Sequence, residues 1–303
     1  MHVNCTEKRA LVKGSDGTHL YARLWAPEVK NPQILPTVFL CDGILCDGYI
    51  WKYIIPFLSS KVRVVHWHYR GHGRSENPSV CGHTTIANHA SDLLSVVEAF
   101  QLPNASKPVW IGHSMGCQVI LEAYRLAPEM PEALVLCFGS SGKITHTFHG
   151  SSVLAKILPR IGGKVAQYPS IARALWSRIP SEWAYRLAVL TREIDGRAVS
   201  REDLLPYLHH MTHVDPPIFL QMLEAAGEHS AGGMLKTIRC PCLVLSGSRD
   251  TFTPSHLAKQ MADSIAGSEY VELEWASHAG LVERPKTIEP ILHSFLTRAG
   301  ILS

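Results

Sequence analysis

The chain has 303 residues, of which 46% are hydrophobic and 18% are charged. This balance is typical of a globular protein with a substantial core, and it excludes a disordered, collagen-like or coiled-coil chain. The formal charge is only +3 at pH 7, without Lys/Arg clusters, so no nucleic-acid partner is indicated. The length fits one large domain or two ordinary ones, and a small-molecule partner is the remaining expectation.

The first residues give no targeting signal. Glu7, Lys8 and Arg9 lie where a secretory signal peptide needs its apolar core. No apolar run approaches the roughly 18 residues of a membrane span, and no concentrated basic patch suits an anionic membrane surface. We therefore expect a cytoplasmic protein without stable membrane insertion. Its eight cysteines are expected to be reduced, because several, such as Cys41 and Cys137, lie in apolar strand-like runs.

Short apolar runs alternate with helix-period segments over most of the chain. Two runs flank a Gly-Ser-Asp-Gly turn at residues 14–17 and predict a β-hairpin. The later, continuous runs suit strands buried on both faces of a parallel sheet. The predicted strands are residues 9–12, 19–25, 37–40, 62–67, 109–111, 133–138, 242–245 and 270–273, and the predicted helices are 86–100, 115–126 and one over 288–296. The pattern predicts an α/β fold with a mostly parallel eight-stranded sheet flanked by helices.

The alternation stops between residues 143 and 233. This segment carries six prolines and helix-like stretches at 183–190 and 219–226, with a further helix start at Ser200. It is too long for a loop, so we expect a helical layer over one end of the sheet. The predicted organisation is a core of residues 1–142 and 234–303, with a helical cap of residues 143–233 inserted after the sixth strand.

The strongest chemical signal is Gly112-His113-Ser114-Met115-Gly116. It follows a predicted strand and opens a predicted helix, which is the context that a nucleophile elbow requires. The glycines allow a turn so tight that side chains at their positions would collide. We expect Ser114 to be held in a strained conformation, at a helix N-terminus that presents free amides.

With these residues the chain resembles the α/β-hydrolase fold superfamily, particularly its capped, esterase- and lipase-like serine hydrolases. The resemblance implies the order nucleophile, acid, histidine. Asp250, in Ser-Gly-Ser-Arg-Asp after a predicted strand, matches the acid, and His278, after the last predicted strand, matches the histidine. The residues between Ser114 and Asp250 are numerous enough to include the cap, and those between Asp250 and His278 suffice for one helix and one strand.

The three groups imply acyl transfer. His278 would remove the proton of Ser114, and Asp250 would fix the imidazole tautomer and stabilise the imidazolium. The oxyanion would need two N–H donors. Met115 supplies the first by its position after the nucleophile, and the resemblance implies Ile44 as the second.

Asp42 departs from the family pattern, because it stands where a histidine is usual. It either braces the loop, as aspartate readily does in turns, or it alters the acid–base chemistry or selects a substrate with a hydrogen-bond donor. The loop around Arg70 and His72 also resembles a family motif that supports the site.

The substrate pocket is expected to be mostly apolar. Its candidates are Asp42, Trp51, Tyr53, Trp183 and Phe219, although packing of the cap helices on each other would also explain the last two. No metal is expected, because the histidine-rich segment 209–213 lacks the acidic residue of a recognisable zinc pattern.

The predicted function is hydrolysis of a carboxylic ester, thioester or lactone with an apolar acyl part, without a cofactor. Two alternatives stay open. One is hydrolysis of a carbon–carbon bond with the same three residues, and the other is a ligand-binding protein that kept the fold and lost turnover.

Overall fold

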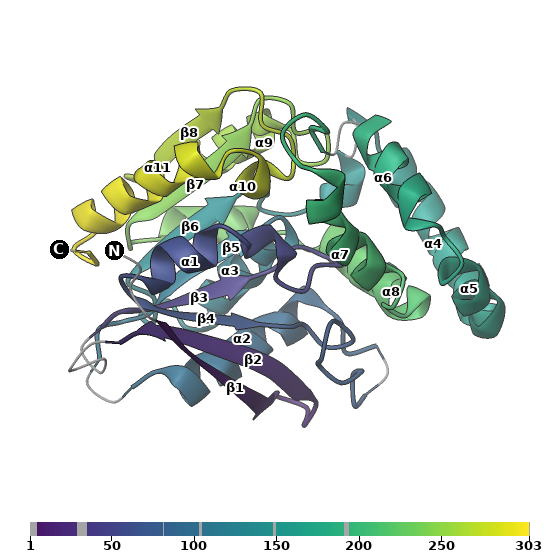
Figure 1. Cartoon of the computed structure of the whole chain (residues 1–303), viewed down its shortest axis with the longest axis horizontal. Coiled ribbons are helices and arrows are strands. Elements are labelled where there is room, and N and C mark those ends of the chain that lie inside the picture. The colour runs from purple at the N-terminus through teal and green to yellow at the C-terminus, as the bar shows by residue number, and fades with distance from the viewer. Residues whose placement is uncertain are drawn as a thin grey trace.

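A computed structural model describes residues 5–28, 35–80, 82–102, 105–147, 150–190 and 194–302, without the side chains of residues 187, 202 and 203. Within these residues one eight-stranded sheet has the order β1-β2-β4-β3-β5-β6-β7-β8 (Figure 1). β1 and β2 form the predicted antiparallel hairpin, and the pairs from β4 onward are parallel. The strands are β1 (Cys5–Lys13), β2 (His19–Pro27), β3 (Thr37–Cys41), β4 (Arg63–Trp67), β5 (Val109–His113), β6 (Ala133–Cys137), β7 (Cys242–Gly247) and β8 (Glu269–Leu273).

Helices cover both faces of the sheet, because the side chains of each parallel strand alternate between two apolar clusters. Phe39 of β3 packs with α2 (Ile86–Phe100), α3 (Met115–Leu126) and α9 (Ser255–Asp263). Its neighbour Leu40 packs with α1 (Ile54–Ser59) and α11 (Pro285–Arg298) on the opposite face (Figure 1). The continuous apolar runs of the sequence therefore correspond to strands buried on both sides.

Among the described residues, five α-helices lie between β6 and β7, on the side of the molecule away from both termini (Figure 1). The second half of this insertion contacts the core. Tyr207 stacks on Tyr49 with ring centroids 5.5 Å apart, and the Gln118 side chain of α3 donates to the carbonyl of Ala226. The helices are α4 (Val153–Gln167), α5 (Pro169–Trp176), α6 (Ser181–Leu190), α7 (Arg201–Met211) and α8 (Pro216–Glu228).

All eight predicted strands and the predicted fold class are found, but four helices were not predicted. α1 is short and continuously apolar, so it has no helical period. α4 contains Pro159, Gly162 and Gly163, which are poor helix formers, and it is stabilised by packing on α8. The other two are α5 and the four-residue α10 (Gly280–Glu283), whereas α9 is the helix expected between Asp250 and His278. Within the described residues no helix is long and apolar enough to cross a membrane.

Candidate active site

A tight turn joins β5 to α3 at Ser114. Ser114 has φ 54° and ψ −118°, an uncommon conformation that costs a residue with a side chain of order 1–3 kcal/mol. A Cβ on Gly112 would lie 2.5 Å from the carbonyl carbon of Gly116, and one on Gly116 would lie 2.2 Å from the carbonyl oxygen of Cys41. Both glycines are therefore required by the close approach of β3, β5 and α3, and the backbone of Ser114 is strained as expected.

The structure brings Ser114, His278 and Asp250 together from three loops. Nε2 of His278 lies 2.9 Å from Oγ of Ser114, and Nδ1 lies 2.9 Å from Oδ2 of Asp250. The three residues follow the carboxyl ends of β5, β8 and β7, where open α/β sheets hold their ligands. The Asp250 side chain is fully buried, whereas that of His278 keeps 17% exposure. The imidazole is therefore partly accessible from outside while its carboxylate partner is shielded from water.

Thr253 orients the carboxylate and was not predicted as a site residue. Its backbone N–H donates to Oδ1 of Asp250 at 2.8 Å, and its Oγ1 lies 2.8 Å from Oδ2. The N–H of Phe252 is a further donor to Oδ1, at 2.9 Å. The signal was present in the sequence, because a Thr three residues after an Asp suits a turn closed by local side-chain bonds.

His113 is a second residue that sequence reasoning missed. Its ring Nε2–H donates to the backbone carbonyl of His278 at 3.0 Å, because a carbonyl can only accept. Burial, followed by the nearby charge of His278, lowers the pKa of His113 to about 3. It is therefore a neutral donor at ordinary pH, and it fixes the backbone beside the imidazole that meets Ser114.

The loop after β3 lies directly against Ser114. A Cβ on Gly43 would lie 3.2 Å from Cβ of Ser114 and 2.9 Å from Nδ1 of His113, so only glycine fits there. In the described part of the chain, neither the N–H of Ile44 nor that of Met115 donates to a protein acceptor. Both predicted oxyanion donors thus remain available, one on the loop against Ser114 and one in the first turn of α3.

Asp42 braces this loop instead of lining a pocket, and the prediction that Asp42 and Trp51 contact substrate is corrected here. Both side chains are fully buried. The carboxylate of Asp42 accepts from Nε1–H of Trp51 at 2.7 Å and from Nε2 of His66 at 2.8 Å. The hydroxyl of Tyr69 donates to the Asp42 carbonyl at 2.8 Å. The side chain and the backbone of Asp42 are therefore both anchored to the core.

His72 anchors the other end of the loop. Its Nε2 accepts the N–H of Leu45 at 3.3 Å, and its Nδ1 lies 3.2 Å from the carbonyl of Arg70. Burial lowers the pKa of His72 to about 4, so the ring is neutral at pH 7 and Nε2 is free to accept. The loop that carries Ile44 is thus held at both ends.

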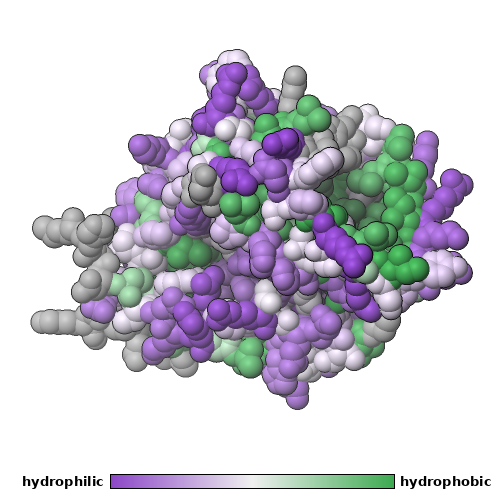
Figure 2. Space-filling view, turned by 45° about the vertical axis from the view of Figure 1, so that its right-hand side comes forward, coloured by the Kyte–Doolittle hydropathy of each residue, from purple (hydrophilic) through white to green (hydrophobic). Residues whose placement is uncertain are grey.

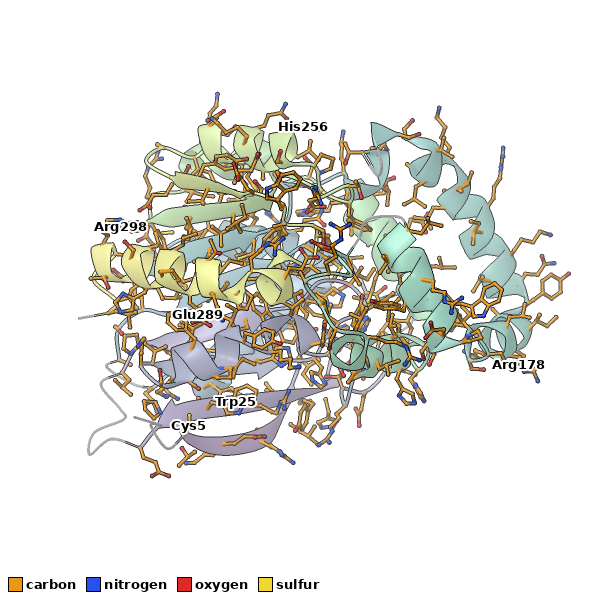
Figure 3. All side chains as sticks on the ribbon, turned by 45° about the horizontal axis from the view of Figure 1, so that its top comes forward. Cys5, Trp25, Arg178, His256, Glu289 and Arg298 are labelled. Atoms are coloured by element: carbon orange, nitrogen blue, oxygen red, sulfur yellow. The ribbon has the colours of Figure 1, made fainter. Side chains whose placement is uncertain are left out.

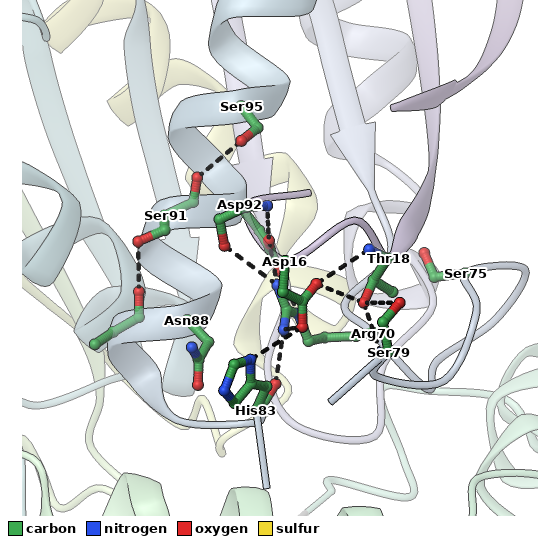
Figure 4. A network of polar contacts seen from close by, with 12 residues as sticks. Asp16, Thr18, Arg70, Ser75, Ser79, His83, Asn88, Ser91, Asp92 and Ser95 are labelled. Atoms are coloured by element: carbon green, nitrogen blue, oxygen red, sulfur yellow. Dashed lines mark hydrogen bonds and ion pairs between the residues drawn. The ribbon is translucent and has the colours of Figure 1, made fainter. Parts of the chain in front are cut away.

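Arg70 ties the loop after β4 to α2 and to the β1–β2 turn (Figure 4). It is fully buried and forms a two-pronged ion pair with Asp92, at 2.7 and 2.6 Å, and a further pair with Asp16 at 2.6 Å. Burial alone would raise the pKa of Asp16, but hydrogen bonds from Thr18 and the charge of Arg70 lower it to about 2. This network fixes the loop that carries His72, which contacts the carbonyl of Arg70 and the N–H of Leu45.

The other pocket candidates are either exposed or packed against other side chains. Trp183 is 74% exposed on α6, so it belongs to the molecular surface and not to a closed pocket. Phe219 of α8 packs against Trp176, with ring centroids 5.4 Å apart, which is the packing alternative. Tyr53 is half-buried at the start of α1 and packs with the apolar cluster on that face.

A surface cavity of about 330 Å³ lies beside the loops that carry Asp250 and His278, but neither residue lines it. Its walls are mostly charged. The lining residues are Asp195, Arg197, Ala198, Arg249, Trp275 and Arg284.

Residues 38–290 match the family model described as "Alpha/beta hydrolase family". The chain therefore belongs to the alpha/beta hydrolase family. It is 28% identical over 267 residues to "Putative carbamate hydrolase RutD" of Klebsiella pneumoniae subsp. pneumoniae, covering 86% of this chain and 91% of that protein. It is 24% identical over 264 residues to "Pimeloyl-[acyl-carrier protein] methyl ester esterase" of Methylococcus capsulatus, covering 86% of this chain and 94% of that protein. Among solved structures, the enol-lactonase from Burkholderia xenovorans LB400 has a similar fold, with a TM-score of 0.71, 23% identity and coverage of 96% and 100%.

Proposed function

We propose that this chain is a serine hydrolase that cleaves a carboxylic ester, thioester or lactone with an apolar acyl part. The observation that carries the proposal is the unbroken chain of contacts from Ser114 Oγ through His278 to Asp250, with both steps at 2.9 Å. A hydroxyl, a base and an orienting carboxylate at hydrogen-bond distance are the arrangement that makes a weak hydroxyl nucleophile reactive.

The first half of the reaction forms an acyl-enzyme. His278 Nε2 takes the proton of Ser114 as Oγ attacks the carbonyl carbon, and Asp250 stabilises the resulting imidazolium through Nδ1–H. The N–H groups of Ile44 and Met115 receive the oxyanion, where each preorganised donor contributes about 100- to 1,000-fold in rate. The imidazolium then returns its proton to the leaving oxygen or sulfur as the bond to the acyl carbon breaks.

The second half uses the same groups with water as the nucleophile. His278 removes a proton from the water that attacks the acyl carbon, and Ser114 Oγ leaves with that proton. Asp250 again orients the imidazole, and its carboxylate is held in place by the N–H groups of Phe252 and Thr253. No cofactor takes part in the proposed reaction.

The helical insertion of residues 143–233 acts as a cap in this proposal. Its α7 contacts the loop after β3 through Tyr207 on Tyr49 and through His210, whose Nδ1 lies 3.7 Å from Asp47. The residues of α8 are mostly apolar and this helix packs on the core, which supports an apolar acyl part. The names of the relatives, an ester hydrolase and a carbamate hydrolase, support attack on a carbonyl that carries a heteroatom leaving group.

The direct test is labelling with a fluorophosphonate probe, followed by a substrate panel. We expect Ser114 to be labelled and Ser114→Ala to be neither labelled nor active, whereas Ser170→Ala, which changes an exposed serine of α5, behaves as the unaltered protein. The panel contains p-nitrophenyl esters of increasing acyl length, thioesters, lactones, a carbamate and a vinylogous diketone. Turnover of the diketone alone would replace the proposal by carbon–carbon bond hydrolysis, and a folded protein without labelling or turnover would favour a ligand-binding role.

A further inference from the structure

The first three helices of the insertion carry most of the exposed large hydrophobic side chains of the molecule. Nine of the thirteen found among the described residues lie between positions 153 and 190. In Figure 2 the hydrophobic surface on the right-hand side is continuous and is bordered by hydrophilic residues at its outer edge. The nine are Val153, Ile157, Ile161, Tyr168, Ile171, Leu175, Ile179, Trp183 and Leu190.

On α4 the exposed apolar residues are 153, 157 and 161, which repeat every four positions and therefore form one stripe along the helix. Leu158 is buried and faces the rest of the insertion. A second stripe with the same spacing consists of Lys156, Arg160 and Lys164, and it runs beside the apolar one. α4 thus has a packed side, an exposed apolar side and an adjoining basic side.

Exposed apolar residues with basic residues nearby also occur on the next two helices. On α5, Ile171 and Leu175 are 60% and 65% exposed, and Arg178 follows at the far tip of the insertion (Figure 3). On α6, Trp183 and Leu190 are the most exposed apolar side chains, with Arg186 between them in sequence. Each helix therefore places basic residues at the border of an exposed apolar face.

The charge of this segment differs from that of the remaining chain. Residues 153–190 contain six basic residues and one acidic residue, a formal charge of +5, whereas the complete chain carries +3, which leaves −2 for all other residues. Arg173 pairs with Asp215, and Arg186 with Glu182. In the described part of the chain, no acidic side chain pairs with the other four, Lys156, Arg160, Lys164 and Arg178. The expectation of no concentrated basic patch is corrected, because helical spacing gathers charges that are separated in sequence.

We propose that the exposed face of α4, α5 and α6 docks on an anionic lipid surface, with its apolar side chains among the acyl chains and its basic side chains against the headgroups. Amphipathic helices with Lys and Arg beside large apolar residues lie in the interface plane of membranes in this way. A second copy of the chain fits less well, because two faces of charge +5 would repel each other. The docking uses no triad residue and does not depend on the proposed catalysis.

Vesicle binding tests this surface in isolation from turnover. Ser114→Ala protein is mixed with vesicles of phosphatidylcholine alone or of equal phosphatidylcholine and phosphatidylglycerol, and bound protein is separated by flotation. We expect binding to the anionic vesicles, weaker binding at high salt, and little binding to the neutral ones. Binding is also expected to shift the emission of the exposed Trp183 to the blue, in a way that Trp183→Phe abolishes.

Two triple variants, each with a matched control, separate the contribution of the basic side chains to binding from that of the apolar side chains. Lys156→Glu/Arg160→Glu/Lys164→Glu is expected to bind anionic vesicles about 100-fold or more weakly, whereas Lys8→Glu/Lys236→Glu/Lys286→Glu, with the same change in charge, retains most of the binding. Ile171→Ser/Leu175→Ser/Trp183→Ser is expected to lose binding, whereas Leu11→Ser/Val80→Ser/Leu126→Ser is not. All six apolar positions are exposed, so thermal unfolding should change little.

The proposal fails if the protein binds neither vesicle type, or if the α4 charge reversal and its control bind equally. A concentration-dependent dimer in light scattering that Ile171→Ser/Leu175→Ser/Trp183→Ser converts to a monomer would assign the face to a second copy instead. None of these results would alter the fluorophosphonate labelling of Ser114, so the two proposals fail independently.

Discussion

The indole Nε1–H of Trp51 donates a hydrogen bond to the carboxylate of Asp42 at 2.7 Å, and neither side chain is exposed. Trp51 ends the short 3₁₀ helix Tyr49–Trp51, and Asp42 immediately precedes Gly43, which lies against Ser114. The bond therefore connects a packed apolar residue with the backbone that positions the Ile44 N–H. Where the family resemblance leads one to expect a histidine, this chain has a carboxylate that hydrogen-bonds Trp51 and His66 and so holds the loop.

Trp51→Phe is expected to lower both stability and turnover. The smaller phenyl ring leaves a cavity and Asp42 loses a buried donor, which together cost about 2–4 kcal/mol of the free energy of unfolding. Displacement of the oxyanion donor should reduce kcat about tenfold, with a smaller change in KM. Urea unfolding and ester hydrolysis measure the two effects. Trp25→Phe, in the β1–β2 hairpin, is the control, and equal behaviour of the two variants would show that the Asp42 bond has no such role.

Thr253→Val is expected to reduce kcat/KM about tenfold, which corresponds to about 1.4 kcal/mol. The isosteric valine removes the hydroxyl 2.8 Å from Oδ2 of Asp250, the oxygen that also accepts from His278. Thr253→Ser keeps this hydroxyl and should stay close to the unaltered protein. Unaltered kcat/KM of Thr253→Val would show that this hydroxyl has no such role.

The parts of the fold that sequence predicted well are those with strong local signals. β3 to β7 are fully buried and mostly apolar, and α3 begins directly after Ser114 and ends before Pro128. Motif and order single out Ser114, Asp250 and His278, and the structure brings their side chains within hydrogen-bond distance. α4 was missed because its local propensity is poor, and its helix depends on packing against α8, which cannot be read from residues 153–167 alone.

The supporting residues were harder to predict, because their partners are brought together by the sheet. Asp42 and His66 end up 2.8 Å apart because β3 and β4 are neighbours, and nothing in either segment specifies that pairing. His113 contacts the backbone of a residue far along the chain, His278. A pattern of residue types indicates what a site can do, whereas the contacts that hold it depend on which strands lie side by side.

Asp92→Asn is expected to destabilise the fold by about 3 kcal/mol, because it leaves the fully buried Arg70 with an incomplete set of acceptors. The residues that meet substrate are unchanged, so kcat at a temperature where the protein is folded should fall less than about threefold. Asp263→Asn breaks an exposed pair with Lys259 and should change stability by less than about 1 kcal/mol. If both variants lose the same free energy of unfolding, the buried Arg70–Asp92 pair contributes no more to stability than an exposed pair.

Three buried histidines predict how stability depends on pH. Burial lowers the pKa values of His68, His72 and His113 to about 2, 4 and 3, whereas histidines of an unfolded chain have pKa values near 6.5. Below pH 6.5 the unfolded chain therefore binds protons that the folded chain does not, so the free energy of unfolding falls as the pH falls.

Between pH 7 and pH 5 each of these groups should remove about 1–2 kcal/mol, which urea unfolding at several pH values can measure. His68→Gln removes one titrating group and keeps a side-chain acceptor for the N–H of Arg74, which donates to Nδ1 of His68 at 2.9 Å. The stability of this variant should consequently fall by about 1–2 kcal/mol less over the same range. If the free energy of unfolding stays constant from pH 7 to pH 5, these buried imidazoles are not neutral. His72 would then not act as the acceptor for the N–H of Leu45, in the loop beside Ser114.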